Sequence, residues 1–262
     1  MGLEGRTALV TGAARGIGRV AARVLAEAGA RVAVADRDPR VEETAERLRE
    51  QGAESAAAVF DVASADEVRA GIARLAVALG PIDVLVSNAA IVDHIAPVVR
   101  MQVERWEREL AVNLGGAFHL IQAVLPGMIE RSWGRIVVIS SGAARGGLRL
   151  QAGYAASKSG LIGLAQTVAL EHARDGITCN AILPGLIETE NVAQMPAEIR
   201  EAVIARTPAQ RLGTMEEVAH LIAFLASDAA GFINGAEIPI DGGASLNAGT
   251  LGSRREVRRS GG

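Results

Sequence analysis

Two side chains that could carry proton chemistry stand four residues apart in the second half of the chain. Tyr154 is the only tyrosine among the 262 residues, and Lys158 is the only lysine, because every other Lys or Arg position holds arginine. Residues at this spacing lie on one face of a helix. Lysine presents a compact point charge with three donors, whereas arginine presents a planar fork. The pair therefore predicts an acid–base site rather than an exposed surface pair.

One neighbouring positive charge is enough to activate the phenol. Tyrosine has an ordinary pKa of about 10, so proton transfer at neutral pH needs a pKa lower by about 3 units, or roughly 4 kcal/mol. Two unit charges about 4 Å apart interact by about that amount at an effective dielectric constant of about 20. We therefore expect Lys158 to lower the pKa of Tyr154.

Composition excludes several classes of protein. Hydrophobic residues make up 49% of the chain and charged residues 22%, which is ordinary for a globular α/β protein. A net charge of −3 gives no reason to expect nucleic acid or an anionic membrane as a partner. No signal peptide and no apolar run of about 18 residues is evident, so we expect a cytoplasmic protein. The single cysteine, Cys179, falls in a predicted buried strand and is expected to be inert core.

Short apolar runs alternate with segments of helical periodicity along the chain. The runs cover residues 7–11, 31–36, 55–60, 82–87, 135–140 and 177–183. A seventh run, 236–240, contains Pro239, which cannot donate to a ladder and so predicts a strand at the sheet edge. Parallel strands need crossover connections, which the helical segments provide. The pattern predicts a doubly wound Rossmann-type α/β fold with a seven-stranded parallel sheet and helices on both faces.

Polar residues and composition mark the predicted boundaries. Ser64 with Glu67 and Thr214 with Glu217 have the spacing of capping boxes, which open helices. We expect one dinucleotide-binding and catalytic domain over residues 1–248, with a substrate loop at about 186–213. Residues 249–262 are rich in Gly and Arg and are expected to form a flexible, solvated tail.

A glycine-rich turn follows the first predicted strand and reads TGAARGIG from Thr11 to Gly18. Glycines in such a turn let the backbone approach a pyrophosphate, whose charge the helix N-terminus favours. Asp36 ends the second strand 20 residues after Gly16, near the spacing of a carboxylate that accepts ribose hydroxyls. A carboxylate there repels a 2′-phosphate and favours NAD over NADP. NADP use stays open because Arg15 and Arg37 lie close to it.

The chain resembles the short-chain dehydrogenase/reductase family, in its shorter single-domain branch. The resemblance extends from about Leu3 to Gly243, and the glycine spacing of the turn is the family's own. Ser87 and Ala90 replace an asparagine and a glycine of the family pattern. The turn and the resemblance together predict these cofactor contacts: Gly12, Arg15, Gly16, Ile17, Gly18, Asp36, Arg37, Asp61, Val62, Asn88, Ala89, Ala90, Tyr154, Lys158, Pro184, Gly185, Ile187 and Thr189.

The resemblance also implies a catalytic set of Asn113, Ser141, Tyr154 and Lys158. Ser141 stands thirteen residues before the tyrosine, as the family places it, and would hydrogen-bond the substrate oxygen. Lys158 would bond the nicotinamide ribose, and Asn113 would hold a water that relays protons to Lys158. Relatives are commonly tetramers joined through two long helices, here about 104–130 and 154–174, so a homotetramer is expected.

The histidines give no metal site at the level of sequence. His119, His172 and His220 fall in helical stretches without Cys or paired acidic residues at metal spacing, so structural roles are expected and no metal is predicted. His94 follows the loop after the fourth strand, where the family builds part of its substrate pocket. It is a weaker candidate for contact with a polar substrate group.

The predicted pocket walls indicate a small, mainly apolar substrate. Residues 91–97, 143–151 and 186–206 carry Val92, Ile95, Leu148, Leu186, Val192 and Met195. They favour a secondary alcohol or ketone over a sugar phosphate, which would need clustered basic residues. A rival activity is that of a 3-oxoacyl-(acyl-carrier-protein) reductase, although Ser132 and Asp175 stand where those proteins tend to carry arginines. A rival of another class is an NAD-binding regulator without turnover.

Overall fold

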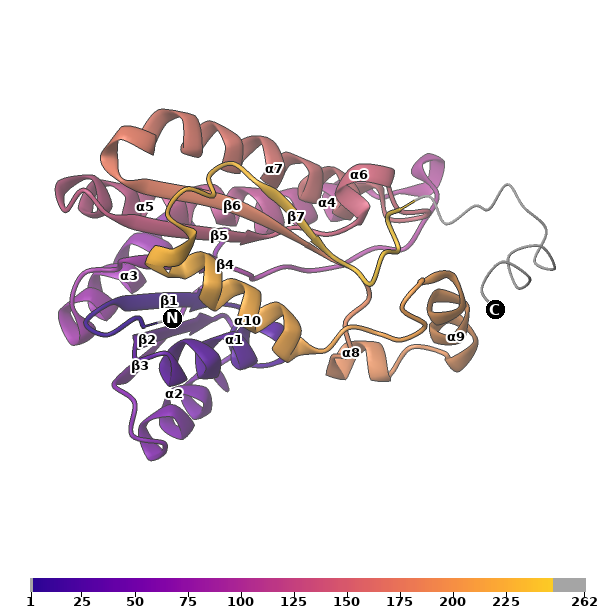
Figure 1. Ribbon diagram of the computed structural model, residues 1–262. Helices are drawn as coiled ribbons and strands as arrows, with labels where there is room; N and C mark the ends of the chain where they lie inside the picture. The colour runs from indigo at the N-terminus through magenta and orange to yellow at the C-terminus, as the bar shows by residue number, and fades with distance from the viewer. Residues whose placement is uncertain (1, 247–262) are drawn as a thin grey trace.

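A seven-stranded parallel sheet forms the centre of the molecule. The computed structural model describes residues 2–246, and its sheet has the order β3-β2-β1-β4-β5-β6-β7 (Figure 1). This confirms the predicted fold class. Every neighbouring pair of strands is parallel. The strands are β1 (Thr7–Thr11), β2 (Arg31–Asp36), β3 (Ser55–Val59), β4 (Val84–Ser87), β5 (Gly134–Ile139), β6 (Ile177–Pro184) and β7 (Glu237–Ile240).

The strand order places a crevice at the carboxyl ends of the central strands. β1 pairs with β2 on one side and with β4 on the other, so the winding of the chain reverses at β1. Doubly wound sheets bind ligands at such a switch point. β7 pairs only with β6 at the edge, as Pro239 predicts. β4 starts two residues later than predicted, and just before it the Asp83 carboxylate accepts the Thr7 amide proton at 3.0 Å.

Helices cover both faces of the sheet, which explains why its strands are apolar on both sides (Figure 1). In β1, Ala8 and Val10 belong to one core cluster and Leu9 to the other, as the period of two in a strand requires. One face is covered by α1 (Gly16–Glu27), α2 (Val41–Glu50) and α10 (Met215–Ala226). The opposite face is covered by α3 (Ala65–Leu79), α5 (Gly116–Glu130) and α7 (Ala152–His172).

The helix predicted over 104–130 is continuous but not uniform. α4 (Val103–Leu110) passes through one π-helical turn, Ala111–Gly115, into α5. By length and composition, Val103–Glu130 is apolar enough to cross a membrane. In this fold its second half packs beside α3, and Leu120 and Ile121 lie in the core beneath the sheet. The π-helical turn carries Asn113, a member of the predicted catalytic set.

Two helix starts differ in how fully they are capped. At α10, Thr214 and Glu217 form both bonds of a capping box. At α3, the Ser64 hydroxyl accepts from the Glu67 amide, but the Glu67 carboxylate accepts from the Asp61 amide at 3.0 Å. The predicted box at Ser64 is therefore only half present, because the loop after β3 takes up the carboxylate.

The remaining elements lie at the crevice or connect the layers. α8 (Glu190–Ala193) and α9 (Ala197–Arg206) stand away from the sheet between β6 and α10 (Figure 1). A bridge between Ile187 and Gly213 joins the two ends of this segment. Short elements are α6 (Ala143–Gly146) and 3-10 turns at Val98–Arg100, Ala173–Asp175 and Asp228–Ala230. The predicted tail, 249–262, lies outside the described residues.

Candidate active site

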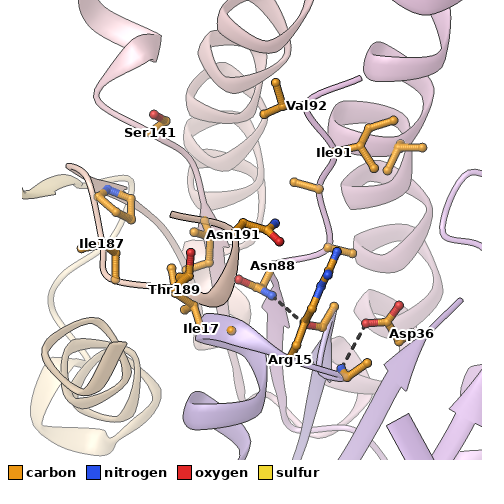
Figure 2. A pocket seen from close by; sticks show the side chains of 18 of the residues that line it. Arg15, Ile17, Asp36, Asn88, Ile91, Val92, Ser141, Ile187, Thr189 and Asn191 are labelled. Carbon is orange, nitrogen blue, oxygen red and sulfur yellow. Dashed lines mark hydrogen bonds between the residues drawn. The ribbon is translucent and has the colours of Figure 1, made fainter. Parts of the chain in front are cut away.

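A cavity of about 630 Å³ opens over the carboxyl ends of the central strands. Asp36 lies on one side of it and Ser141 on the other, while Ile187 and Thr189 come from the segment after β6 (Figure 2). Among the predicted cofactor contacts, all line the cavity except Gly18. Of the predicted catalytic set, Ser141, Tyr154 and Lys158 line it, whereas Asn113 lies behind the wall.

The glycine-rich turn is fastened to the end of β4. The side-chain amide of Asn88 donates through Nδ2 to the Thr11 and Gly12 carbonyls at 2.9 and 3.2 Å. Gly12 has a φ of +66°, and a Cβ there would lie 2.8 Å from the Ala89 Cα. A Cβ at Gly18 would lie 2.3 Å from the Gly12 carbonyl oxygen, so the structure gives Gly18 a packing role in the turn rather than a place on the cavity wall.

The amino end of α1 faces the cavity with unpaired backbone donors. Gly16 opens the helix, and the residue before it, Arg15, has an extended backbone. Amides and the helix dipole at such an end favour an anion. Asp36 accepts the Ala14 amide proton at 3.1 Å, which holds the turn against the end of β2 (Figure 2). Asp36 also accepts the Asp38 amide proton at 3.0 Å. A carboxylate has about four acceptor sites, so about two remain for hydroxyl protons.

Asp61 and Val62 form the wall of the cavity next to Arg37. Burial raises the pKa of Asp61, but the Ala63 amide and the Arg108 guanidinium more than offset it and hold that pKa below its usual value. Arg108 on α4 bonds the carboxylate at 2.9 Å. This ion pair ties the end of β3 to the helix that carries Asn113.

Tyr154 and Lys158 lie on α7 at the cavity, where Lys158 is buried and Tyr154 is half-buried. The Lys158 ammonium donates to the Ile139 carbonyl at 2.6 Å and lies 5.7 Å from the centre of the Tyr154 ring. Burial lowers the pKa of Lys158 to about 8. Burial also raises the pKa of Tyr154, the Ser141 hydroxyl lowers it, and the charge of Glu109 raises it. The expected lowering of the Tyr154 pKa by Lys158 is not observed, because desolvation of the phenol dominates.

Ser141 and Asn113 are held by backbone groups. The Ala143 amide donates to the Ser141 oxygen at 3.1 Å, which leaves the hydroxyl proton of Ser141 free for another acceptor. The Asn113 side chain accepts from the Ile91 amide at 2.8 Å and donates to the Ile91 carbonyl and to Ser157. Asn113 thus fastens the loop after β4, and its water relay stays a prediction.

The segment after β6 covers the side of the cavity next to the glycine-rich turn. Glu190 on α8 forms an ion pair with Arg19 on α1 at 2.6 Å, across the end of the glycine-rich turn. Glu190, Asn191 and Val192 line the cavity beyond the predicted Thr189. The sequence contains no signal for the pairing, because Arg19 and Glu190 are brought together only by the fold.

Several predicted wall residues do not reach the cavity. Val92, Leu186 and Val192 line it, but Ile95, Leu148, Met195 and His94 are not among its lining residues. In the described residues no cluster of His, Cys, Asp or Glu could hold a metal ion. Cys179 is buried in β6, and burial raises the pKa of its thiol to about 12, which confirms the prediction of an inert thiol.

The fold, the turn and the Tyr–Lys pair define a dinucleotide-binding oxidoreductase of the doubly wound class. A family model described as enoyl-(acyl carrier protein) reductase matches residues 12–245. The 3-oxoacyl-(acyl-carrier-protein) reductase of Pseudomonas aeruginosa is 40% identical over 249 residues, 94% of this chain and 100% of that protein. The chain belongs to the short-chain dehydrogenase/reductase family.

Two further relatives have different reported substrates. A cis-4-hydroxycyclohexanecarboxylate dehydrogenase from Sinomonas cyclohexanicum is 40% identical, over 91% of this chain and 96% of that protein. The crystal structure of a gluconate 5-dehydrogenase from Burkholderia cenocepacia, in complex with NADP and tartrate, has a TM-score of 0.89 and 38% identity, covering 94% of this chain and 98% of that one. The relatives thus agree on the reaction type and differ in substrate.

Proposed function

We propose that the protein transfers a hydride between NAD(H) and a mainly apolar secondary alcohol or ketone, with Tyr154 as the general acid and base. The observation that carries the proposal is the placement of Tyr154, Lys158 and Ser141 at one end of a cavity whose other end holds Asp36. The two ends are suited to the two reactants. When bound, the nicotinamide accepts or supplies the hydride.

The side chains at the substrate end would divide the proton work between them. With its oxygen already bonded by the Ala143 amide, Ser141 can donate its proton to the substrate oxygen. Tyr154 would give a proton to that oxygen in ketone reduction and remove one in alcohol oxidation. Lys158 has donors left beyond its bond to Ile139, which suits it to the ribose hydroxyls and to stabilising the phenolate. Asn113 would hold the relay water.

The proposed preference for NAD rests on Asp36. Its carboxylate lies at the end of β2 beside the glycine-rich turn, where a 2′-phosphate would meet a negative charge. Arg15 and Arg37 also line this part of the cavity and would reduce the repulsion. The gluconate 5-dehydrogenase relative was crystallised with NADP, so the cofactor preference of this chain has to be measured directly.

The apolar character of the wall supports a small neutral substrate. Val92, Leu186 and Val192 line the cavity, and the basic side chains that line it besides Lys158 are Arg15 and Arg37, beside Asp36. The relative active on acyl-carrier-protein substrates makes that reaction a second candidate. Against it, Ser132 and Asp175 stand where such reductases tend to carry arginines. The guanidinium of Arg131, one residue before Ser132, is engaged by Asp83 and by the Ile82 carbonyl.

The proposed function is tested by following nicotinamide absorbance. Purified protein is supplied with NAD, NADP or their reduced forms and with a panel of secondary alcohols, ketones and a 3-oxoacyl thioester. Turnover of simple alcohols with NAD is expected. Preference for the thioester would favour the second candidate, and strong preference for NADP would refute the role given to Asp36. Cofactor consumption at the background rate by both wild type and Tyr154→Phe would favour a non-catalytic regulator.

We also propose a cytoplasmic homotetramer joined through α4–α5 and α7. These helices carry outward apolar side chains, with Phe118 exposed by 47% and Leu170 by 83%. Apolar surface of this kind is commonly covered in an assembly. Light scattering of the purified protein should give four times the mass of the chain, and the mass of a monomer would refute the assembly.

A further inference from the structure

A buried carboxylate that the proposed mechanism does not use lies beside the catalytic tyrosine. Two carboxylate residues are fully buried in the part of the chain that the structure describes, Asp83 and Glu109. Asp83 pairs with Arg131 at 3.2 Å. Glu109, at the end of α4, has an exposed fraction of zero, and one of its oxygens has no hydrogen-bond partner among the described residues. Burying such a group is costly, which suggests that it serves a purpose.

The bonded oxygen of Glu109 holds the wall of the substrate pocket. Its Oε1 accepts the Asp93 amide proton at 2.7 Å. Four residues further along the helix, Asn113 holds Ile91 through both its amide and its carbonyl. The loop is thus fastened on either side of Val92, which lines the cavity (Figure 2).

The second oxygen of Glu109 lies against the start of α7. A Cβ on Gly153 would come within 2.2 Å of Glu109 Oε2, so only glycine fits there. Gly153 is the residue before Tyr154. The charge of Glu109 raises the pKa of the Tyr154 phenol, an effect smaller than those of burial and of the Ser141 hydrogen bond. One side chain therefore spans from the pocket wall to the backbone that carries the tyrosine.

We propose that Glu109 is a positioning residue that sets the distance between the 91–93 wall of the substrate pocket and Tyr154. It bonds Asp93 with one oxygen and packs against Gly153 with the other. The inference rests on the proposed function, because it concerns how a substrate held by that wall meets the phenol. Displacing reacting groups by about 1 Å can cost about 100-fold in rate.

The first test compares Glu109→Ala with Glu109→Gln. Glutamine keeps an oxygen for the Asp93 amide, so it should retain kcat and KM within about 3-fold. Alanine leaves the wall unfastened and should lower kcat/KM for the alcohol by about 100-fold, with the Kd for NAD unchanged. Glu107→Gln, on the exposed side of the same helix, is the matched control and should behave as wild type.

The second test uses the contact with Gly153. Gly153→Ala should lower kcat/KM at least about 10-fold, because its methyl group displaces the Glu109 carboxylate. Adding Glu109→Ala removes the clash, so the double variant should be no worse than Glu109→Ala alone. Residues in contact give such non-additive effects, whereas independent roles multiply. This arm also decides the inference if Glu109→Ala fails to fold.

The outcomes separate this inference from the proposed function. Wild-type kinetics in Glu109→Ala, equal impairment by glutamine and alanine, or multiplied losses in the double variant would each overturn the role of Glu109 alone. A wild type that turns over no alcohol or ketone would overturn the proposed function, and the positioning role with it.

Discussion

The two ends of the cavity are formed by different kinds of structural element. The end next to Asp36 is made mainly of strand ends and a tight turn, in which Gly12 and Gly18 leave no room for a Cβ and the Asn88 side chain bonds the Thr11 and Gly12 carbonyls. The substrate end is made of loops, held by single side chains such as Glu109 and Asn113. Backbone constraints leave clear sequence patterns, whereas loop positions depend on contacts between distant residues. Substitutions at the substrate end should therefore leave binding at the cofactor end largely unchanged.

The strongest test of this separation is Tyr154→Phe. Removing the phenol oxygen should lower kcat by about 1,000-fold, because general acid–base catalysis contributes roughly 100- to 10,000-fold. The Kd for NAD, measured by fluorescence titration, should change by less than about 3-fold. A variant that keeps a tenth of the wild-type kcat would show that Tyr154 is not the proton donor.

A change at the opposite end should alter the cofactor and leave the alcohol unaffected. Asp36→Asn removes the charge that a 2′-phosphate would meet, worth about 2 kcal/mol, so the NAD-to-NADP ratio of kcat/KM should fall about 30-fold. Asp38→Asn is the matched control, since Asp38 also lines the cavity but is paired with Arg40. An unchanged ratio in Asp36→Asn would contradict the assignment.

Lys158 lies beside Tyr154 at the substrate end, and its burial has a cost that can be measured. Its pKa of about 8, against an ordinary 10.5, means that the folded state carries a costly buried charge below pH 8. Burying the charge costs about 3 kcal/mol, and the bond to the Ile139 carbonyl offsets roughly half of that cost. Lys158→Met should abolish turnover and yet raise the free energy of unfolding at pH 7 by about 1 to 2 kcal/mol.

The pH dependence gives the sign of this effect. Between pH 8 and 10.5 the unfolded wild type binds more protons at Lys158 than the folded one, so wild-type stability from this group rises with pH. The advantage of Lys158→Met should shrink over that window. Urea unfolding at pH 7 and near pH 10 measures it, and a less stable variant at pH 7 would show that Lys158 does not carry this cost.

The smallest effect is expected on the apolar wall. Val92→Ser removes apolar contact worth about 1 kcal/mol, so kcat/KM for an apolar alcohol should fall about 5-fold while the Kd for NAD stays constant. Val77→Ser, on the outer face of α3 and 89% exposed, is the control. Equal kinetics in both variants would place the substrate elsewhere.

The parts of the molecule that follow from local pattern could be predicted. The seven apolar runs correspond to the seven strands because strands buried on both faces have few polar residues, and Pro239 correctly marks the edge. The positions of Asp36 and Gly16 beside the cavity also follow from local pattern, because one ends β2 and the other belongs to the glycine-rich turn after β1. The placement of Gly18 behind the turn depends on how closely α1 approaches Gly12, which spacing alone does not reveal.

The parts that depend on distant contacts could not be predicted. Glu109 has no sequence signal, because a Glu in an otherwise charged helix usually faces solvent. Its burial arises from the fit of α4 against Asp93 and Gly153. The pKa of Tyr154 likewise follows from burial on α7, which outweighs a lysine four residues away. The related feature of the sequence is the glycine directly before Tyr154, which by itself does not indicate a buried carboxylate.

Because the chain contains one tyrosine, Tyr154 can serve as an intrinsic spectroscopic probe. A phenolate absorbs light at longer wavelengths than a phenol, and here every such change in the folded chain comes from Tyr154. The two tryptophans, Trp106 and Trp133, do not ionise and give a constant background. A titration by ultraviolet absorbance would therefore follow the ionisation of Tyr154 alone, without labels, and would record how an added cofactor changes its pKa.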